Sequence, residues 1–130
     1  MKLIGYTLPR PFAGYSIPIS VQSVYLRSFC QARGFDYALP VTEFYTPKNY
    51  SALSGILGQN VEGMVCISVF IFEELLSCPS VLERFLGRSD ITIWCPLENE
   101  SGDPRYILER IIEFKKLNRL SNRQSRGASG

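Results

Sequence analysis

The sequence predicts an α/β domain built on an open parallel sheet of four strands in the order 2-1-3-4, with helices on both faces. Strand-like and helix-like segments alternate along the whole chain. The stretch Gly63–Phe70 is almost continuously apolar, which is typical of a central parallel strand buried on both faces. Pro40 falls in the second strand and has no N–H to donate, so that strand is expected at a sheet edge.

The first strand is expected over Lys2–Thr7, and a loop with three of the eight prolines follows it. This loop is too irregular for a simple turn and too apolar for a disordered linker. Ser20 is predicted to cap a helix over Val21–Arg33, which Gly34 ends. Helical spacing assigns an apolar face to Val21, Val24, Tyr25, Phe29 and Ala32.

The second strand is predicted over Phe35–Phe44. A marginal helix over Ser51–Gly58 should turn Leu53, Ile56 and Leu57 inward. After the central strand, Phe72–Leu76 is expected to begin a helical turn. Pro79 suits the first position of a further helix, which ends at Gly87 and whose inner face holds Val81, Leu82, Phe85 and Leu86.

The fourth strand is expected over Asp90–Cys95, and Pro96–Gly102 is predicted to be polar and flexible. Asp103 and Pro104 together form a strong helix start, and the last helix should run to about Leu120. Residues 121–130 contain no large apolar residue, so we expect a disordered basic tail. Residues 1–120 should form a single domain.

Composition excludes several kinds of chemistry. The chain has no histidine, so a Ser-His-Asp or Cys-His relay within one chain is excluded. The four cysteines form no C-x-x-C pair and are expected to be reduced and mostly buried, so no metal site is predicted. The glycines do not form a dinucleotide or P-loop pattern, and no cofactor is predicted. We expect no membrane span and no signal peptide, which makes the cytoplasm the default compartment.

Charge is nearly balanced, with a formal net charge of +2. The positive residues that stand out lie at the C-terminal end: Lys115, Lys116, Arg119, Arg123 and Arg126. A short basic end is usually solvated, and so binding of nucleic acid is disfavoured.

A ligand site is expected where the strand order reverses, because open parallel sheets bind ligands beyond the carboxyl ends of their strands. In the flavodoxin-like order 2-1-3-4 this point lies between the first and third strands. The residues that follow the strands are Thr7, Arg10, Phe12, Tyr15, Ser16, Thr42, Glu43, Tyr45, Ser68, Phe70, Glu98 and Asn99.

Among these residues, Arg10 lies between two prolines, and a guanidinium on a stiff loop suits recognition of carboxylate or phosphate. Backbone donors at the helix start near Gln22 would assist it, whereas a structural pair with Glu43 is the alternative. Glu43 is the best candidate for general acid–base work, against a solvated or salt-bridged carboxylate.

Tyrosines and one serine complete the candidate ligand site. Tyr6, Tyr15, Tyr45 and Tyr50 suit stacking on a sugar or base, although most such tyrosines are packing residues with a polar tip. Ser68 ends the most buried strand and lacks a histidine to activate it. The predicted ligand-binding set is Tyr6, Arg10, Phe12, Tyr15, Ser16, Gln22, Tyr45 and Ser68, with Glu43 for proton transfer.

Five short motifs occur in an order that resembles the sporadic carbohydrate cluster proteins, which are small bacterial proteins from surface-polysaccharide gene clusters. The motifs are Gly5-Tyr6, Arg10-Pro11-Phe12, Pro18-Ile19-Ser20-Val21-Gln22, Arg27-Ser28-Phe29-Cys30 and Thr42-Glu43-Phe44. This resemblance covers most of the chain to about Glu98. It implies a role in cell-surface carbohydrate biosynthesis and brings no established reaction.

The architecture also resembles the catalytic domain of serine recombinases, which implies a resolvase-like sheet. Both begin with a Gly-Tyr strand and a helix that starts near a glutamine. That family requires an arginine followed by a serine nucleophile directly after the first strand. Here Pro11 follows Arg10, so recombinase chemistry is disfavoured.

The leading expectation is therefore a domain that binds or transforms an anionic sugar or sugar nucleotide during surface polysaccharide synthesis. The alternative is a non-catalytic interaction or regulatory module that partners a carbohydrate-biosynthesis enzyme. A degenerate recombinase-like nucleic-acid binder is the least favoured. The sequence leaves open whether the domain is an enzyme. The apolar helix face around Ile107–Phe114 and the open sheet edges are compatible with a homo-oligomer.

Overall fold

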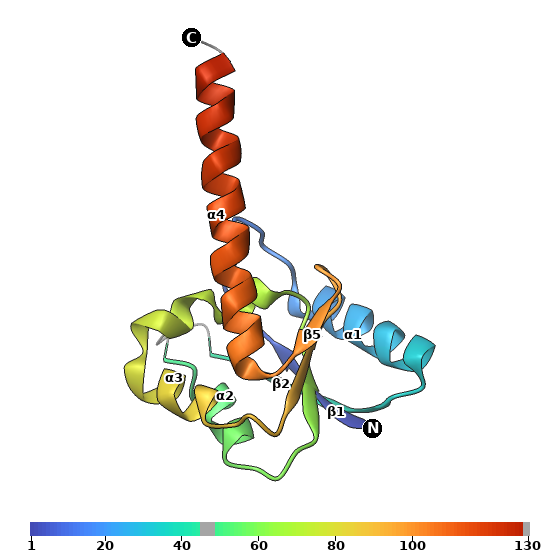
Figure 1. Cartoon of the computed structure of the whole chain (residues 1–130). Helices are drawn as coiled ribbons and strands as arrows, with labels where there is room; N and C mark the ends of the chain where they lie inside the picture. Colours follow the sequence, from blue (N-terminus) through green and yellow to red (C-terminus); the bar gives the residue numbers. More distant parts are fainter. Residues whose placement is uncertain (45–48, 129–130) are drawn as a thin grey trace.

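The computed structural model describes residues 1–44 and 49–128, with side chains left undescribed at 39 and from 120 onward. It contains one mixed sheet with helices against both faces and a long C-terminal helix that rises out of the body (Figure 1). The strand order is β2-β1-β3-β4-β5. The predicted order of the first four strands is confirmed, but the sheet has a fifth strand and is not purely parallel.

The strands are short except at the β1–β2 side of the sheet. Their bounds are β1 Lys2–Thr7, β2 Asp36–Thr42, β3 Gly63–Val65, β4 Thr92–Cys95 and β5 Glu100–Gly102. As predicted from Pro40, β2 lies at an edge. β5 is antiparallel to β4 and forms a hairpin with it, in a segment where the sequence predicted only a flexible loop.

The two faces of the sheet follow from its register. Leu3 of β1 is paired with Tyr37 of β2 and with Gly63 of β3, so these residues share one face. That face also carries Gly5, which lies beneath the ring of Tyr37: a Cβ atom added at Gly5 would be 2.5 Å from the Tyr37 hydroxyl oxygen. Glycine at position 5 therefore leaves room for the Tyr37 side chain of the neighbouring strand, which any larger residue would displace.

Helix α1, Ile19–Arg33, covers the face that holds Trp94. The rings of Phe29 and Phe35 lie 6.2 and 5.1 Å from the Trp94 ring. The Arg33 guanidinium stacks on Phe29 at 5.0 Å. Gly34 ends the helix in the left-handed conformation, with φ of 71°, as predicted.

The predicted inner face of α1 is wrong except at Phe29, which packs against the core, and Ala32 near the helix end is exposed. The buried residues are Gln22, Leu26 and Cys30, whereas Val21, Val24 and Tyr25 are exposed. Gln22 is buried because its amide forms hydrogen bonds with the backbone of the preceding loop. With Gln22 facing inward, the helix is oriented so that Val21, Val24 and Tyr25 face solvent. The predicted cap is also wrong, since Pro18 occupies the N-cap position and no side chain caps the helix.

The opposite face is covered by three short helices: α2, Ser51–Leu57; the 3-10 helix η1, Val69–Ser77; and α3, Pro79–Leu86. The ring of Phe72 in η1 stacks on Tyr6 of β1 at 6.0 Å and on Phe85 of α3 at 5.0 Å. The predicted helix start at Pro79 is confirmed. Leu53, Ile56 and Leu57 of α2 are buried, as their spacing predicted.

The last helix, α4, spans Pro104–Ala128. It begins against the domain, and its C-terminal part projects away from the domain (Figure 1). Asp103 caps it through a 2.9 Å bond from the Tyr106 N–H, which confirms the predicted start. Its first turns bury Ile107, Leu108 and Ile111 against the domain. We expected the helix to end near Leu120 and a disordered tail to follow; α4 instead continues to Ala128, because no proline or glycine interrupts it before Gly127.

Within the described residues, no helix is long and apolar enough to cross a membrane. Cys30, Cys66 and Cys95 are buried, and Cys78 is half-buried. The Cys66 and Cys95 sulfurs are 3.5 Å apart, and burial raises the pKa of the Cys95 thiol well above its usual value.

Candidate functional site

The side chain of Gln22 ties together the two ends of the loop that leaves β1. Its amide oxygen accepts from the Leu8 N–H at 3.1 Å, and its amide nitrogen donates to the carbonyls of Leu8 and Ile17, both at 2.8 Å. These bonds join both ends of the loop to the first turn of α1. The predicted ligand-binding residue Gln22 therefore has a fully buried, structural set of partners.

Between these anchored ends, the loop makes a tight turn. The N–H groups of Phe12 and Tyr15 each donate to the other residue's carbonyl at 2.9 Å. Ala13 and Gly14 between them have φ of 51° and 79°. Two successive left-handed residues match a hairpin turn of type I′. The turn carries Ala13 and Tyr15 to the carboxyl edge of the sheet, where two cavities meet.

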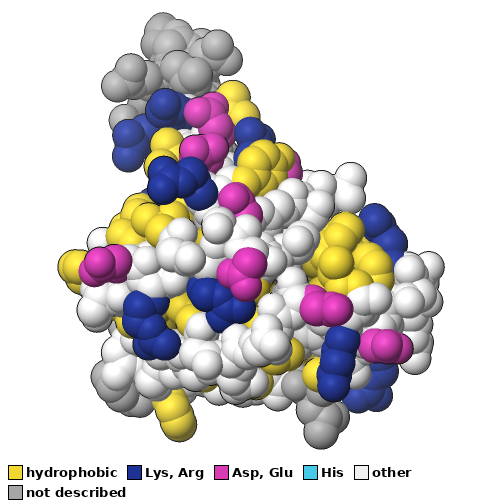
Figure 2. Space-filling view, turned by 60° about the horizontal axis from the view of Figure 1, so that its bottom comes forward, with side chains coloured by type: hydrophobic (Ala, Val, Ile, Leu, Met, Phe, Trp, Pro, Cys, Tyr) yellow, Lys and Arg dark blue, Asp and Glu magenta, His cyan; other side chains and the backbone are white. Residues whose placement is uncertain are grey.

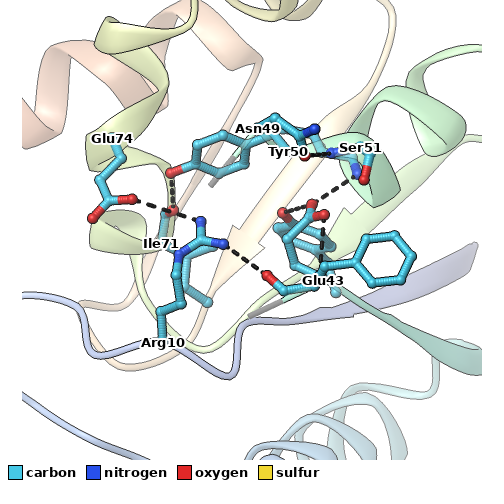
Figure 3. A network of polar contacts seen from close by, with 10 residues as sticks. Arg10, Glu43, Asn49, Tyr50, Ser51, Ile71 and Glu74 are labelled. Atoms are coloured by element: carbon cyan, nitrogen blue, oxygen red, sulfur yellow. Dashed lines mark hydrogen bonds and ion pairs between the residues drawn. The ribbon is translucent and has the colours of Figure 1, made fainter. Parts of the chain in front are cut away.

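Arg10 lies inside the protein rather than on the loop's surface, with only 2% of it exposed. It donates to the Phe44 carbonyl at 2.8 Å and forms an ion pair with Glu74 at 3.6 Å (Figure 3). Its guanidinium also lies over the Tyr50 ring at 5.6 Å. Among the described residues, Nε and one terminal nitrogen have no hydrogen-bond acceptor.

The pairing of Arg10 corrects the alternative drawn from the sequence. Its carboxylate partner is Glu74 of η1, not Glu43. Glu43 lies next to the Phe44 carbonyl that Arg10 binds, so the two side chains belong to one polar network (Figure 3). Recognition of an external anion by Arg10 stays a prediction.

Glu43 is a buried anchor for α2. Its carboxylate accepts from the Tyr6 hydroxyl at 2.7 Å and from the N–H groups of Ala52 and Leu53 at 2.9 and 3.1 Å. Burial, reinforced by this carboxylate, raises the pKa of Tyr6 far above its ordinary value. The described contacts of Glu43 are all internal, and its predicted role in proton transfer stays untested.

The first of the two cavities, which we call the polar cavity, has a volume of about 400 Å³. It is lined by Leu8, Pro11, Phe12, Ala13, Tyr50, Phe70, Ile71, Glu73, Glu74, Ser77 and Lys115. On its wall, the Lys115 ammonium of α4 pairs with Glu73 of η1 at 2.8 Å. The polar cavity thus combines aromatic rings with a half-exposed ion pair.

The second cavity, which we call the apolar cavity, has a volume of about 380 Å³. Its lining residues are Ala13, Tyr15, Ile17, Ser68, Phe70, Leu97 and Glu98. Glu98 accepts from the Ser68 hydroxyl and from the Val69 N–H, both at 2.7 Å. Burial raises the pKa of the Glu98 carboxyl, although these two hydrogen bonds partly offset the shift.

The structure brings only some of the predicted site residues together. Tyr15 and Ser68 line the apolar cavity, and Phe12 lines the polar cavity. Tyr6, Arg10, Gln22 and Glu43 are turned into the protein and bind internal groups. Ser16 is exposed and lines neither cavity, and Tyr45 lies outside the described residues.

Three charged residues of the polar cavity were not predicted: Glu73, Glu74 and Lys115. Glu73 and Glu74 were read as ordinary members of a helical turn, and Lys115 as part of a solvated basic end. The helix predicted from Pro104 to about Leu120 already carries Lys115, but the sequence does not indicate that this helix passes η1.

The chemistry available at these cavities is hydrogen bonding, stacking and charge pairing. No group of three or more metal-ligating residues occurs within ranges 1–44 and 49–128. The Ser68 hydroxyl donates its proton to Glu98 and also accepts from the Phe70 N–H at 3.1 Å. This arrangement caps η1 and joins it to the β4–β5 turn.

Comparison with known proteins identifies a structural neighbour. No protein-family model matches the chain, and no curated protein matches its sequence. The crystal structure of the N-terminal catalytic domain of TP901-1 integrase matches with a TM-score of 0.56 and 18% sequence identity. The match covers 89% of this chain and 97% of that chain. At this identity the likeness shows a shared, resolvase-like fold, as the architecture of the sequence implied.

Proposed function

We propose that this domain binds an anionic sugar or a sugar nucleotide in the polar cavity, as part of bacterial surface carbohydrate biosynthesis. The observation that carries the proposal is the composition of that cavity. The partly exposed ring of Phe70, with the buried rings of Phe12 and Tyr50 behind it, lies beside the paired charges of Glu73 and Lys115. The biological context rests on the order of the five sequence motifs.

A sugar matches both kinds of surface in the polar cavity. Its ring offers apolar C–H faces that pack on aromatic side chains, and its hydroxyls both donate and accept hydrogen bonds. Glu73, Glu74 and Ser77 supply acceptors, and Ser77 and Lys115 supply donors. A volume of about 400 Å³ lies within the usual range of small-molecule sites, roughly 300–1,000 Å³.

Lys115 is the residue best placed to receive a negative group. Its side chain is 39% exposed, and its partner Glu73 is 32% exposed, so a carboxylate or phosphate can approach and exchange for Glu73. Arg10 is 2% exposed and already paired with Glu74, which leaves it a supporting positive charge behind the cavity. This moves the anion-binding role from Arg10 to Lys115.

The test is a thermal-stabilisation screen of sugar phosphates, uronic acids and nucleotide sugars, because a ligand that binds only the folded state raises the unfolding temperature. Lys115→Met should abolish the stabilisation. Lys116→Met is the matched control, since the Lys116 side chain is 64% exposed and its ammonium lies 3.9 Å from Glu113 on the same helix. The proposal fails if no anionic sugar stabilises the protein, or if the two variants respond alike.

A second candidate is the interaction module that partners a carbohydrate-biosynthesis enzyme. It is supported by the exposed apolar side chains of Val21, Val24 and Tyr25 on α1, which are 51%, 65% and 43% exposed. Cross-linking in native cells should then capture a glycosyltransferase or synthase with the wild-type chain and lose it with Val24→Glu. Capture that survives this substitution would exclude the α1 surface.

Nucleic-acid binding is the third and least favoured candidate. The likeness to an integrase catalytic domain is its ground, but Pro11 follows Arg10 where a nucleophilic serine would be required. Over the face shown in Figure 2, positive and negative side chains are interspersed. Salt-dependent DNA binding that weakens on removal of residues after Leu120 would support this candidate.

A further inference from the structure

The apolar cavity adjoins the polar cavity, and the two share Ala13 and Phe70 in their walls. Apart from Ser68 and Glu98, its lining consists of apolar and aromatic side chains. Tyr15 and Leu97 of this lining are 61% and 48% exposed, so the cavity is accessible from solvent on their side. A ligand seated in the polar cavity can therefore extend past the turn at Ala13 into an apolar, aromatic space.

Among the described residues that line the apolar cavity, Glu98 is the one charged group. Each of its oxygens accepts one internal hydrogen bond, from the Val69 N–H and the Ser68 hydroxyl. An ionised carboxylate has about four acceptor positions, so it retains capacity for a ligand beside these two bonds and the interaction with its own backbone N–H. The two internal bonds also fix the carboxylate's orientation, which favours a ligand with two adjacent donors.

We propose that the apolar cavity binds a nucleobase, and specifically guanine, whose adjacent N1–H and N2–H groups pair with the Glu98 carboxylate. The base would pack between Tyr15 and the Phe70–Leu97 wall. This deepens the proposed function: it rests on a sugar nucleotide as the ligand, and it identifies that ligand as a guanosine nucleotide sugar.

The chemistry of the lining separates guanine from other occupants. An alkyl chain would bury the Glu98 carboxylate without giving it a donor, which is costly. Adenine and cytosine each place a ring-nitrogen acceptor beside their amino group, and uracil flanks its single N–H with two carbonyls. These bases would bring a lone pair toward the second carboxylate oxygen, so the site should reject them.

Charge sets the direction in which the ligand lies. Phosphates would be repelled by Glu98 and attracted by the Lys115 ammonium on the wall of the polar cavity. The base therefore belongs at Glu98, and the phosphates and sugar belong at the Lys115 end, with the turn at Ala13 between them.

The experiment is an NMR titration of the full chain with the 5′-monophosphates of guanosine, inosine, adenosine and uridine. These probes share ribose and phosphate, so differences among them report the base alone. Inosine lacks only the exocyclic amine of guanosine. We expect the guanosine probe to bind about tenfold more tightly than the inosine probe, because one hydrogen bond to a charged group is lost. Equal affinity for all four probes would overturn the proposal.

Two variants locate the binding. Tyr15→Ala should weaken binding of the guanosine probe about tenfold, since the stacking of the base on an aromatic ring is lost. The fold should be preserved because Tyr15 is exposed. Glu98→Gln should remove the preference for guanosine over inosine. Retention of that preference in Glu98→Gln, or full affinity in Tyr15→Ala, would place the base elsewhere.

Lys115→Met distinguishes this proposal from the proposed function. It should weaken all four monophosphates by the same factor and leave the guanosine-to-inosine ratio unchanged. If the ratio is present but Lys115→Met has no effect, the base site stands and the polar cavity is not the phosphate site. If anionic sugars bind through Lys115 and the ratio is absent, the polar cavity stands and the guanine proposal is wrong.

Discussion

Glu43 and Glu98 both follow a strand at the carboxyl edge of the sheet, and both bind backbone N–H groups in the first turn of a helix. Glu43 anchors α2, and Glu98 anchors η1. They differ in what else surrounds them. Glu43 is 2% exposed and also holds the Tyr6 hydroxyl, whereas Glu98 lines a cavity and is only partly buried.

This contrast shows that position at the carboxyl edge does not by itself identify a ligand-binding residue. Both carboxylates occupy the place where open parallel sheets bind ligands. Two properties distinguish the carboxylates. One is how many hydrogen bonds each can still accept beside those from internal donors, and the other is whether the carboxylate lines a cavity. By both criteria Glu98, after β4, is accessible to a ligand, whereas Glu43, after β2, is not.

The largest effect should come from Glu43→Ala. It leaves the Tyr6 hydroxyl and the N–H groups of Ala52 and Leu53 without an acceptor inside the protein. We expect the free energy of unfolding, measured by urea denaturation, to fall by about 3 kcal/mol or more. Tyr6→Phe, which removes one of these donors, should cost clearly less. A loss below about 1 kcal/mol for Glu43→Ala would mean that the β2 side is as open as the β4 side.

Gln22→Leu should have the next largest effect. It leaves the Leu8 N–H and the carbonyls of Leu8 and Ile17 unpaired, so the unfolding free energy should fall by about 2 kcal/mol. The loop that carries the turn at Ala13 should also loosen, which amide hydrogen exchange at Leu8 would detect. Gln31→Leu, on an exposed position of the same helix, is the control and should change stability little.

Glu98→Gln should have a smaller effect that depends on pH. Burial raises the folded-state pKa of this carboxyl above its ordinary value of 4.5, so its proton is held more tightly in the folded state. The resulting stabilisation is present below pH 4.5 and is lost as pH rises through the folded-state pKa. The wild type should therefore lose stability relative to Glu98→Gln as pH rises from 4 to 7. A stability difference that is constant over this range would contradict the burial of Glu98.

The smallest effect is expected for Val24→Ala on α1. Val24 is 65% exposed, so the free energy of unfolding of the isolated chain, measured by thermal denaturation, should change by less than about 0.5 kcal/mol. Leu26→Ala, two residues along the same helix, should cost about 2–5 kcal/mol because Leu26 is fully buried. If the two substitutions cost the same, the assigned inner face of α1 is wrong.

Much of the fold could be predicted because its signals are local. Pro40 places β2 at an edge, and Gly34 and Pro79 mark helix ends by backbone preferences that need no tertiary context. The inner face of α1 could not be predicted, because the apolar pattern takes no account of a buried Gln22 that serves the loop. β5 was missed because Glu100–Gly102 is polar and becomes a strand only by pairing with β4.

The sequence predicted the location of the candidate site better than the identity of its residues. Tyr15, Ser68 and Glu98 lie together at the carboxyl edge, as the strand order indicated. Arg10 was expected beside a ligand and is instead paired with Glu74. Its partner could not be predicted because η1 begins only four residues after β3 ends, which brings Glu74 across the edge of the sheet.

The contact between Gly5 and Tyr37 has a consequence for how this sequence can change. The Tyr37 ring occupies the space that a side chain at Gly5 would need, so a substitution of Gly5 requires the end of the Tyr37 side chain to move. A smaller residue at position 37 would leave room for alanine at position 5. A substitution at position 37 should therefore make position 5 more tolerant of alanine, whereas Gly5→Ala alone should displace the Tyr37 ring.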